Sequence, residues 1–420
     1  MSAWLDDSGL LEIIVREILL INVSGDDKPG VTRAVSTVLF EHGCDILDIG
    51  QAVIHDSLNL GMLAKIPQHQ DGSLVQKEIL YSLHAMDMKV RFQSITEESY
   101  EHWVSQQGKP RHIVTLLARR VTAEQIARVT TITVEQGLNI DKIARLSGRV
   151  PLERLSDDSK SCVEFSLRGV PENMSELRAS LLEMSSEMDV DVAYQEDNIY
   201  RRNRRLVVFD MDSTLIDAEV IDELAKEAGV GEQVAEITES AMRGELDFKE
   251  SFAKRMALLK GLDESVLEHV AKRLQLTEGA ESLISTLKKL GYKTAILSGG
   301  FDYFARRIQN RLGIDYVHAN QLEIVNGKVT GSVSGEVVDG ARKAQLLREI
   351  AKGEKVDLEQ VIAVGDGAND LPMLSIAGLG IAFRAKPLVK ATAKQSISKL
   401  GLDGILYLMG LSDRDTSHWK

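Results

Sequence analysis

The stretch Val207-Val208-Phe209-Asp210-Met211-Asp212-Ser213-Thr214-Leu215 decides the fold of the C-terminal half of the chain. Its apolar start predicts a buried strand, and two carboxylates, Asp210 and Asp212, follow where that strand ends. Open α/β sheets place their sites at this edge. Adjacent carboxylates repel each other unless a proton or cation lies between them, and Mg²⁺ prefers hard oxygen ligands of this kind. Taken alone, the same pair could also serve only to cap a helix.

Further apolar runs predict the rest of a parallel sheet, because near-continuous hydrophobic strands are typical of sheets covered on both faces. The runs are Leu206–Phe209, Lys293–Leu297 and Val361–Val364. Ser298-Gly299-Gly300 follows the second run, where glycines let backbone N–H groups approach a phosphoryl oxygen. Asp366 and Asp370 follow the third run. We therefore expect carboxylates, a hydroxyl group and backbone amides at one edge of the sheet.

Three other segments complete this half of the chain. A charged block over Val220–Leu274 is predicted to be helical. A hairpin should turn at Asn326-Gly327, which is a strong two-residue turn signal. Its expected strands are Leu322–Val325 and Lys328–Val333. An amphipathic helix is predicted over Lys343–Lys352, and Lys343 at its start would supply a fixed positive charge.

Together these segments resemble the four motifs of the haloacid dehalogenase-like superfamily, over residues 205–410. The resemblance implies an α/β fold with a Rossmann-like parallel sheet, in a domain spanning residues 205–412. It also implies a small helical cap at about residues 220–275, which would exclude water and supply specificity. By the same resemblance the chain is a Mg²⁺-dependent phosphatase.

The resemblance also assigns roles to the motif residues. Asp210 would be the nucleophile that forms an aspartyl-phosphate, and Asp212 the general acid and base. Ser298 and Lys343 would stabilise the phosphoryl oxygens. The metal ligands would be Asp210, the main-chain carbonyl of Asp212, and Asp366, with Asp370 supporting the site.

Within that superfamily, the segment from Asp210 to Arg255 is similar to the phosphoserine phosphatase family. A carboxylate at Glu219 and a guanidinium at Arg255 would suit a zwitterion, since Arg grips a carboxylate bidentately. Either residue alone could instead be a solvated helix residue. The substrate contacts that the resemblance implies are Glu219, Met242, Phe248, Arg255, Ser298, Gly299, Lys343 and Asn369. The implied reaction converts phosphoserine to L-serine, the last step of serine biosynthesis.

The N-terminal part contains a repeat with a period of about ninety-five residues, which predicts two copies of one small α+β unit. The first copy should have strands at Glu17–Val23, Ile46–Ile54 and Leu58–Ile66 and a helix at Val31–His42. The second copy begins with a strand at Arg111–Ala118 and a helix at Ala123–Glu135. The polar segment Glu97–Pro110 between them is predicted to be a linker.

Each copy resembles an ACT domain, a ferredoxin-like βαββαβ module that often binds amino acids, with expected limits of 1–96 and 108–198. The first copy has the family's loop, in which Asp27 and Gly30 would bind a regulatory amino acid such as serine. A plain strand-to-helix turn is the alternative. The second copy has Arg119-Arg120-Val121 at this place and lacks the Pro-Gly element, so we expect no such ligand there. Because ACT modules commonly pair edge to edge, a homodimer is expected.

Composition narrows the class of protein. The 420 residues carry a net charge of −13, which argues against nucleic-acid binding. The basic cluster Arg201, Arg202, Arg204 and Arg205 is predicted to be a solvated linker. No stretch is long enough to span a bilayer, and two distant cysteines, Cys44 and Cys162, suit free thiols in a reducing cytoplasm.

Four other functions are alternatives to this prediction. A phosphotransferase would pass the phosphoryl group to an alcohol, and a related phosphatase would act on another small metabolite such as phosphoglycolate. An amino-acid-sensing binding protein would have a degenerate catalytic half, which the intact motifs disfavour. A cation pump is disfavoured because no membrane span is predicted.

Overall fold

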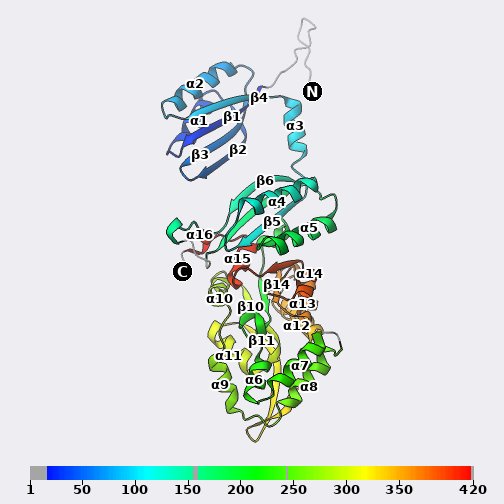
Figure 1. Cartoon of the computed structure of the whole chain (residues 1–420). Helices are drawn as coiled ribbons and strands as arrows, with labels where there is room; N and C mark the ends of the chain where they lie inside the picture. Colours follow the sequence, from blue (N-terminus) through cyan, green and yellow to red (C-terminus); the bar gives the residue numbers. More distant parts are fainter. Residues whose placement is uncertain (1–16, 155–158, 243–244, 418–420) are drawn as a thin grey trace. The chain divides into compact units, whose positions relative to one another are not determined.

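The computed structural model describes residues 17–154, 159–242 and 245–417. The chain divides into two compact units, Met1–Lys109 and Pro110–Lys420 (Figure 1). Among the described residues, no helix combines the length and the apolar character that a membrane span requires.

The described part of the first unit is a four-stranded antiparallel sheet covered by two helices, with strand order β2-β3-β1-β4. Its elements are β1 (Glu17–Asp26), α1 (Val31–Glu41), β2 (Asp45–Ile54), β3 (Ser57–Ile66), α2 (Gly72–His84), β4 (Lys89–Ile95) and α3 (Glu97–Ser105). Alternate residues of β3 are buried, so one face of the sheet forms the core with α1 and α2. The predicted βαββαβ order is confirmed.

Helix α3 contradicts the predicted linker over Glu97–Pro110. The Thr96 side chain caps the helix by accepting a hydrogen bond from the Ser99 amide at 3.1 Å. Glu97 and Glu98 lie in its first turn, where negative charge is favourable. None of the nine residues of this fully described helix is buried. Its apolar residues Tyr100, Trp103 and Val104 lie on one face by their spacing, but that face is not buried.

The second unit begins with another four-stranded antiparallel sheet, with strand order β6-β7-β5-β8 in its described residues. Its elements are β5 (Arg111–Ala118), α4 (Ala123–Glu135), β6 (Asn139–Arg145), β7 (Ser161–Arg168), α5 (Met174–Glu187) and β8 (Asp191–Glu196). Residues of β5 are buried on both faces of the sheet after Arg111. One face packs on α4 and α5, and the other packs on the domain that follows.

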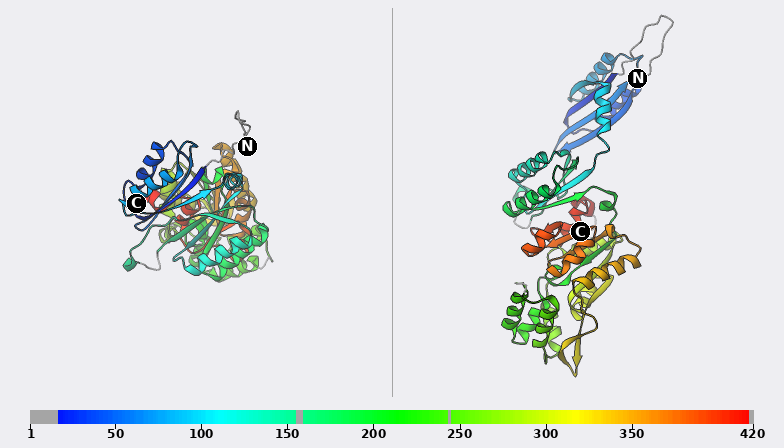
Figure 2. Two further views of the ribbon diagram at one scale, coloured as in Figure 1. Left: turned by 90° about the horizontal axis from the view of Figure 1, so that it is seen from above. Right: turned by 90° about the vertical axis from the view of Figure 1, so that its right-hand side faces the viewer.

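That domain is built on a seven-stranded sheet of order β12-β11-β10-β9-β13-β14-β15, which is parallel except for β12. Its strands are β9 (Leu206–Phe209), β10 (Lys293–Phe301), β11 (Tyr316–Val325), β12 (Lys328–Ser334), β13 (Val361–Gly365), β14 (Leu379–Phe383) and β15 (Gln395–Ile397). Its core helices are α10 (Ala280–Lys289), α11 (Asp302–Leu312), α12 (Gly340–Gly353), α13 (Leu371–Ile376), α14 (Pro387–Thr392), α15 (Ile405–Leu408) and α16 (Asp413–Thr416). Helices cover both faces of this sheet (Figures 1 and 2), as the apolar strands predicted.

The predicted helical block is a cap of four helices in the described residues. They are α6 (Val220–Glu227), α7 (Gly231–Met242), α8 (Phe248–Leu258) and α9 (Ser265–Arg273). The turn between α8 and α9 is bonded to the β11–β12 hairpin, because the Gly261 amide donates to the Val329 carbonyl at 2.8 Å. In Figures 1 and 2 the cap helices lie next to the hairpin formed by β11 and β12.

Two details of this domain differ from the sequence predictions. The hairpin turns at Asn326-Gly327 as expected, but its first strand belongs to the longer β11, which continues the main sheet. Helix α12 begins at Gly340, because the Asp339 side chain accepts from the Arg342 amide at 2.8 Å and caps it there.

The basic cluster before β9 is solvated only in part, because Arg202 and Arg205 are exposed as predicted. Arg201 and Arg204 are both buried. Arg201 pairs with Glu164 of β7, and Arg204 donates to the Glu359 carbonyl. The prediction was wrong for Arg201 and Arg204 because these two side chains serve as internal hydrogen-bond donors, a role that charge patterning does not reveal.

Candidate active site

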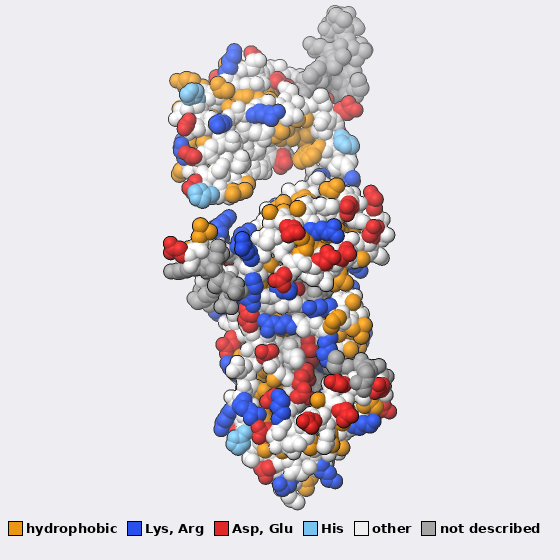
Figure 3. All heavy atoms as spheres, viewed as in Figure 1, with side chains coloured by type: hydrophobic (Ala, Val, Ile, Leu, Met, Phe, Trp, Pro, Cys, Tyr) orange, Lys and Arg blue, Asp and Glu red, His pale blue; other side chains and the backbone are white. Residues whose placement is uncertain are grey.

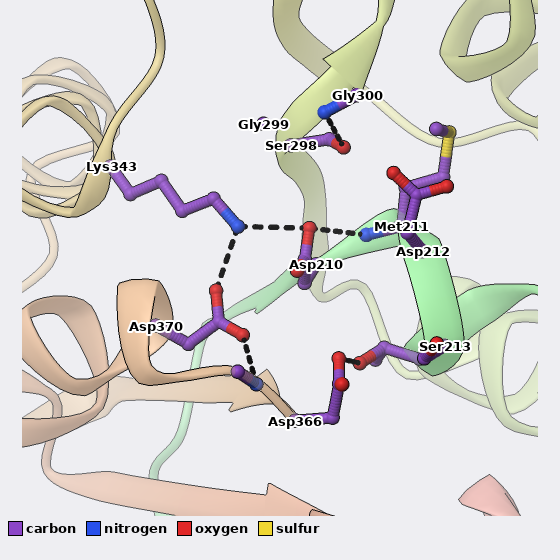
Figure 4. A network of polar contacts seen from close by, with 12 residues as sticks. Asp210, Met211, Asp212, Ser213, Ser298, Gly299, Gly300, Lys343, Asp366 and Asp370 are labelled. Carbon is purple, nitrogen blue, oxygen red and sulfur yellow. Dashed lines mark hydrogen bonds and ion pairs between the residues drawn. The ribbon is translucent and has the colours of Figure 1, made fainter. Parts of the chain in front are cut away.

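The register of three neighbouring strands brings the predicted motifs together. Phe209, the last residue of β9, pairs with Ile296 of β10 on one side and with Val364 of β13 on the other. Asp210, Ser298 and Asp366 therefore follow at the same sheet edge, one or two residues beyond these partners (Figure 4). All seven residues Leu206–Phe209 and Ala295–Leu297 are buried, so the strands are fixed by the apolar core.

The turn after β9 aims the first carboxylate. Asp210 is buried, and its Oδ1 accepts a hydrogen bond from the Met211 amide at 2.7 Å. Ser213 has a φ of 53°, which a non-glycine residue seldom adopts. Such strained positions gather at functional sites, because the surroundings must hold them in place.

A buried lysine joins two of the carboxylates. Lys343 Nζ lies 2.9 Å from Asp210 Oδ1 and 2.7 Å from Asp370 Oδ1 (Figure 4), and the lysine is fully buried. Burial alone would lower the pKa of Lys343, but the two carboxylates raise it above its usual value, so the lysine is charged. The other oxygen of Asp370 accepts from the Gly367 amide at 2.9 Å.

The acidic cluster has an excess of negative charge that suits a cation. Carboxylate oxygens of Asp210, Asp366 and Asp370 lie within 4.8 Å of one another. Burial and then repulsion by Asp370 raise the pKa of Asp210 well above its usual value, although Lys343 opposes the shift. Burial and the same repulsion raise the pKa of Asp366 to about 7. One lysine does not balance three carboxylates, and hard oxygen ligands of this kind suit a divalent cation.

The second carboxylate of the turn, Asp212, lies apart from the cluster. Its Oδ1 accepts from the Val220 amide at 3.0 Å, at the start of α6. Burial and then the charge of Glu219 raise its pKa well above the usual value, which favours the protonated form. A carboxyl group that holds a proton is what a general acid requires.

Gly300 has a second role, which its place in the predicted glycine turn did not reveal. A Cβ at this position would lie 2.8 Å from Met211 Cε and still closer to Asp212 Oδ2. A close approach of this kind explains why a second glycine follows Gly299. Only the structure shows which side chain needs the space.

We predict that Gly300→Ala lowers kcat of the expected phosphatase reaction by about 10²-fold, since displacing a reacting group by roughly 1 Å costs that much. The matched control is Gly353→Ala at the end of α12, where an added Cβ meets nothing within 4 Å. Steady-state kinetics of both variants give the comparison. A wild-type kcat in Gly300→Ala would show that the observed position of the Asp212 carboxyl group is not required for the reaction.

The segment after β10 offers a hydroxyl and backbone amides to the site. Ser298 is fully buried, and its Oγ accepts from the Gly300 amide at 2.9 Å. Asn320, a buried residue that the sequence predictions missed, donates to the Gly299 carbonyl at 2.8 Å and accepts from the Val338 amide at 2.8 Å. Asn320 thus ties the glycine turn to the segment before α12, which carries Lys343.

The cap brings Arg255 close to three carboxylates. Burial lowers the pKa of Arg255, and the charges of Glu219, Asp222 and Asp212 oppose that shift. The buried atoms Arg255 Nε and Asp222 Oδ1 have no hydrogen-bond partner within the described part of the chain. Donors and acceptors without partners at the mouth of a site are available to a ligand. Glu219 accepts from Ser213 Oγ at 2.8 Å, which holds it beside the turn.

The remaining predicted contacts divide into two groups. Asn369 lies in the short turn Ala368–Asp370, and a Cβ at Gly367 would clash with its side chain. The side chains of Met242 and Phe248 lie outside the described residues. In the first unit, Asp27 and Gly30 are exposed, and Gly30 is the N-cap residue of α1, with a φ of 97°.

Comparison with known proteins agrees with this geometry. The sequence profile of the haloacid dehalogenase-like hydrolases matches residues 207–375, and ACT domain profiles match residues 17–93 and 110–195. A solved structure of a haloacid dehalogenase family hydrolase from Salmonella enterica serovar Typhi superposes with a TM-score of 0.60 and 31% identity. It covers 71% of this chain and 98% of that one.

Two curated relatives extend over nearly the whole chain. The phosphoserine phosphatase of Streptomyces coelicolor is 41% identical over 395 residues, which is 94% of this chain and 92% of the relative. The phosphoserine phosphatase SerB2 of Mycobacterium tuberculosis is 40% identical over 94% of this chain and 93% of its own. The alignment includes both ACT domains and the catalytic domain. The chain therefore belongs to the phosphoserine phosphatase family of haloacid dehalogenase-like hydrolases.

Proposed function

We propose that the chain hydrolyses phosphoserine to L-serine and phosphate through an aspartyl-phosphate on Asp210, with Mg²⁺ as cofactor. The single observation that carries the proposal is the convergence of Asp210, Lys343 and Asp366 at one sheet edge. In this proposal the metal is held by Asp210, the main-chain carbonyl of Asp212 and Asp366. Asp370 supports the site by fixing Lys343. The bound cation would neutralise charge on the phosphoryl oxygens.

The side chains divide the reaction between them. An oxygen of Asp210 attacks phosphorus and forms the P–O bond while the bond to the serine oxygen breaks. Asp212 gives its proton to the departing alkoxide and then takes a proton from the water that cleaves the aspartyl-phosphate. Lys343, Ser298 and backbone amides after β10 stabilise the phosphoryl oxygens, and their positions are set before the substrate arrives.

In this proposal, two charged side chains recognise the two charged groups of the serine part of the substrate. Arg255 binds the carboxylate of phosphoserine, and Glu219 accepts from its ammonium group. The unpartnered Arg255 Nε and the proximity of Glu219 support this assignment. Gly299 and Asn369 line the phosphate side, and Met242 and Phe248 complete the proposed pocket from the cap.

The first test is phosphate release from a substrate panel before and after chelation of divalent cations. Phosphoserine should be hydrolysed fastest, and activity should disappear with chelation and return with added Mg²⁺. Arg255→Ala should lower kcat/KM for phosphoserine by about 10- to 100-fold, as expected for a hydrogen bond between charged groups. The same variant should barely change the rate with phosphoethanolamine, which lacks the carboxylate.

The matched control is Lys254→Ala, which removes an exposed cation next to Arg255. Equal losses on both substrates in Arg255→Ala would show that the guanidinium does not read the carboxylate. Full activity after chelation would remove Mg²⁺ from the proposal.

The wider role is proposed on further grounds. The reaction would be the last step of serine biosynthesis in the cytoplasm, and two free cysteines suit that compartment. A homodimer through the first ACT domain is supported by β2, an edge strand with four exposed apolar side chains, Ile46, Ile49, Val53 and Ile54. Serine would bind near Asp27 and Gly30, where helix α1 begins. Absence of binding at millimolar serine would remove this last part.

A further inference from the structure

The second ACT domain is packed against the catalytic domain by the sheet face opposite its helices. Leu117, Cys162 and Ala193 are fully buried and belong to the same apolar cluster as Leu406 and Tyr407 of the catalytic domain. In Figure 1 helix α15 lies against this domain. Burial of apolar residues from both sides makes the two parts one packed body.

Polar contacts fix how the two domains meet. The buried Asp191 accepts from the amides of Ser398 and Lys399 at 2.6 and 2.7 Å. The Tyr194 amide donates to Gln395 Oε1 at 2.9 Å. These bonds join β8 to β15 at the edge of the main sheet. Because buried polar groups need matched partners, they specify a single docked arrangement.

The loop after β5 of the second ACT domain, which corresponds to the predicted ligand loop of the first, contacts the catalytic domain. Arg119 follows β5 at the place where the first domain has its Pro-Gly loop. Its two terminal nitrogens donate to the two carboxylate oxygens of Glu278 at 3.0 and 2.7 Å. Arg384, just after β14, also donates to Glu278, at 3.0 Å. The fork of an arginine holds a carboxylate in a fixed orientation, which lysine does not.

Glu278 lies directly beside the connection between cap and core. We call the two connecting segments, residues 216–219 and 274–277, the cap hinge. They pair with each other, since Ile216 and Leu276 form an antiparallel bridge. The Thr277 amide then donates to the Leu215 carbonyl at 3.0 Å. A shift of Glu278 therefore acts on both segments of the hinge.

The cap hinge is connected to the turn after β9, which carries Asp210 and Asp212. Leu215 follows Thr214, whose fully buried hydroxyl donates to Asp366 Oδ1 at 3.1 Å. On the other side, the Glu278 carbonyl accepts from the Leu402 amide at 2.8 Å. The side chain of Glu278 is thus held by Arg119 of the second ACT domain and by Arg384 of the catalytic domain, and its backbone is held by Leu402.

We propose that Arg119 and Glu278 are positioning residues for phosphoserine hydrolysis. Arg119 orients Glu278, and Glu278 fixes the returning segment of the cap hinge, so that the cap closes over Asp210 in one position. The second ACT domain serves here as a fixed adaptor, which explains why its loop carries arginine in place of the Pro-Gly element. The inference relies on the proposed function for the place of the reaction at Asp210.

The test is a double-mutant cycle on the full chain with Arg119→Ala, Glu278→Gln and the two combined. We expect Arg119→Ala to lower kcat/KM for phosphoserine by about 3- to 10-fold, with kcat and KM both changed, because altered hinge positions affect both constants. In the Glu278→Gln background the same substitution should have a clearly smaller effect, since the two residues act as a unit. The control Arg120→Ala, at the neighbouring exposed arginine, should match the wild type.

Two measurements keep the test decisive. Loss of folded protein would lower apparent kcat and leave KM unchanged, so a change in KM separates positioning from mere stability. Arg119→Lys keeps the positive charge but cannot bind the Glu278 carboxylate through two parallel hydrogen bonds. This variant replaces Arg119→Ala in the test if Arg119→Ala does not fold. The inference is overturned if Arg119→Ala equals Arg120→Ala, or if the cycle is additive. Failure of the proposed function would instead appear in the wild type, as a lack of phosphoserine hydrolysis.

Discussion

Asp210→Asn is expected to abolish turnover, with kcat lowered on the order of 10⁴-fold or more, as for other covalent nucleophiles. An amide has nearly the same shape as the carboxylate but does not attack phosphorus. The measurement is phosphate release from phosphoserine at saturating Mg²⁺. The control Asp357→Asn changes an exposed helix-capping carboxylate that asparagine replaces well.

The same variant should remain folded. In the metal-free protein, burial and repulsion by Asp370 raise the pKa of Asp210, so its ionised form destabilises the folded state at neutral pH. Removing the charge should leave the free energy of unfolding unchanged or increase it. Near-normal activity in Asp210→Asn would refute the nucleophile assignment, whereas an unfolded variant would refute this account of the electrostatics.

Lys343→Met is expected to have the second largest effect, on stability and on activity together. Lys343 is fully buried and bridges Asp210 and Asp370. Removing one partner of a buried ion pair leaves uncompensated charge, which costs about 3–5 kcal/mol in the free energy of unfolding. Loss of a cation beside the phosphoryl group should also lower kcat by about 10²- to 10³-fold.

Urea unfolding and steady-state kinetics check both parts of this prediction. Lys352→Met on the same helix is the matched control, because Lys352 is exposed. A variant with wild-type stability would mean that the buried carboxylates are neutral without the lysine. A variant with wild-type kcat would show that Lys343 takes no part in stabilising the phosphoryl group.

The positions of the core elements were predictable because the sequence signals there are local and strong. The strands before Asp210 and Asp366 are short apolar runs, and Asn326-Gly327 has no common alternative to a tight turn. Parallel pairing then requires that the residues after these strands meet at one edge. That reasoning located the acidic cluster without any knowledge of side-chain contacts.

Other features depend on contacts between residues far apart in the chain, and no local pattern reveals them. Arg201 is buried because Glu164 lies opposite, and Gly300 is needed because Asp212 occupies the space above it. The pairing of Arg119 with Glu278 joins residues 159 positions apart. Helix α3 was missed for a different reason, since its stability comes from its cap and first turn and not from a buried face.

The face in Figure 3 has acidic and basic side chains interspersed over the catalytic domain. The net charge of −13, from which we expect that nucleic acid is not a partner, is thus not concentrated in one patch on this face. The charges that matter for the reaction are instead buried. The catalytic assignment therefore depends on the chemistry at Asp210.

Trapping the covalent intermediate tests this chemistry most directly. The enzyme would be mixed with phosphoserine and Mg²⁺, quenched in acid during turnover, digested, and analysed by peptide mass spectrometry. The account predicts a phosphoryl group on the peptide that contains Asp210, attached to that residue and absent from Asp210→Asn. Turnover with no phosphorylated peptide, or with the phosphoryl group on another residue, would contradict it.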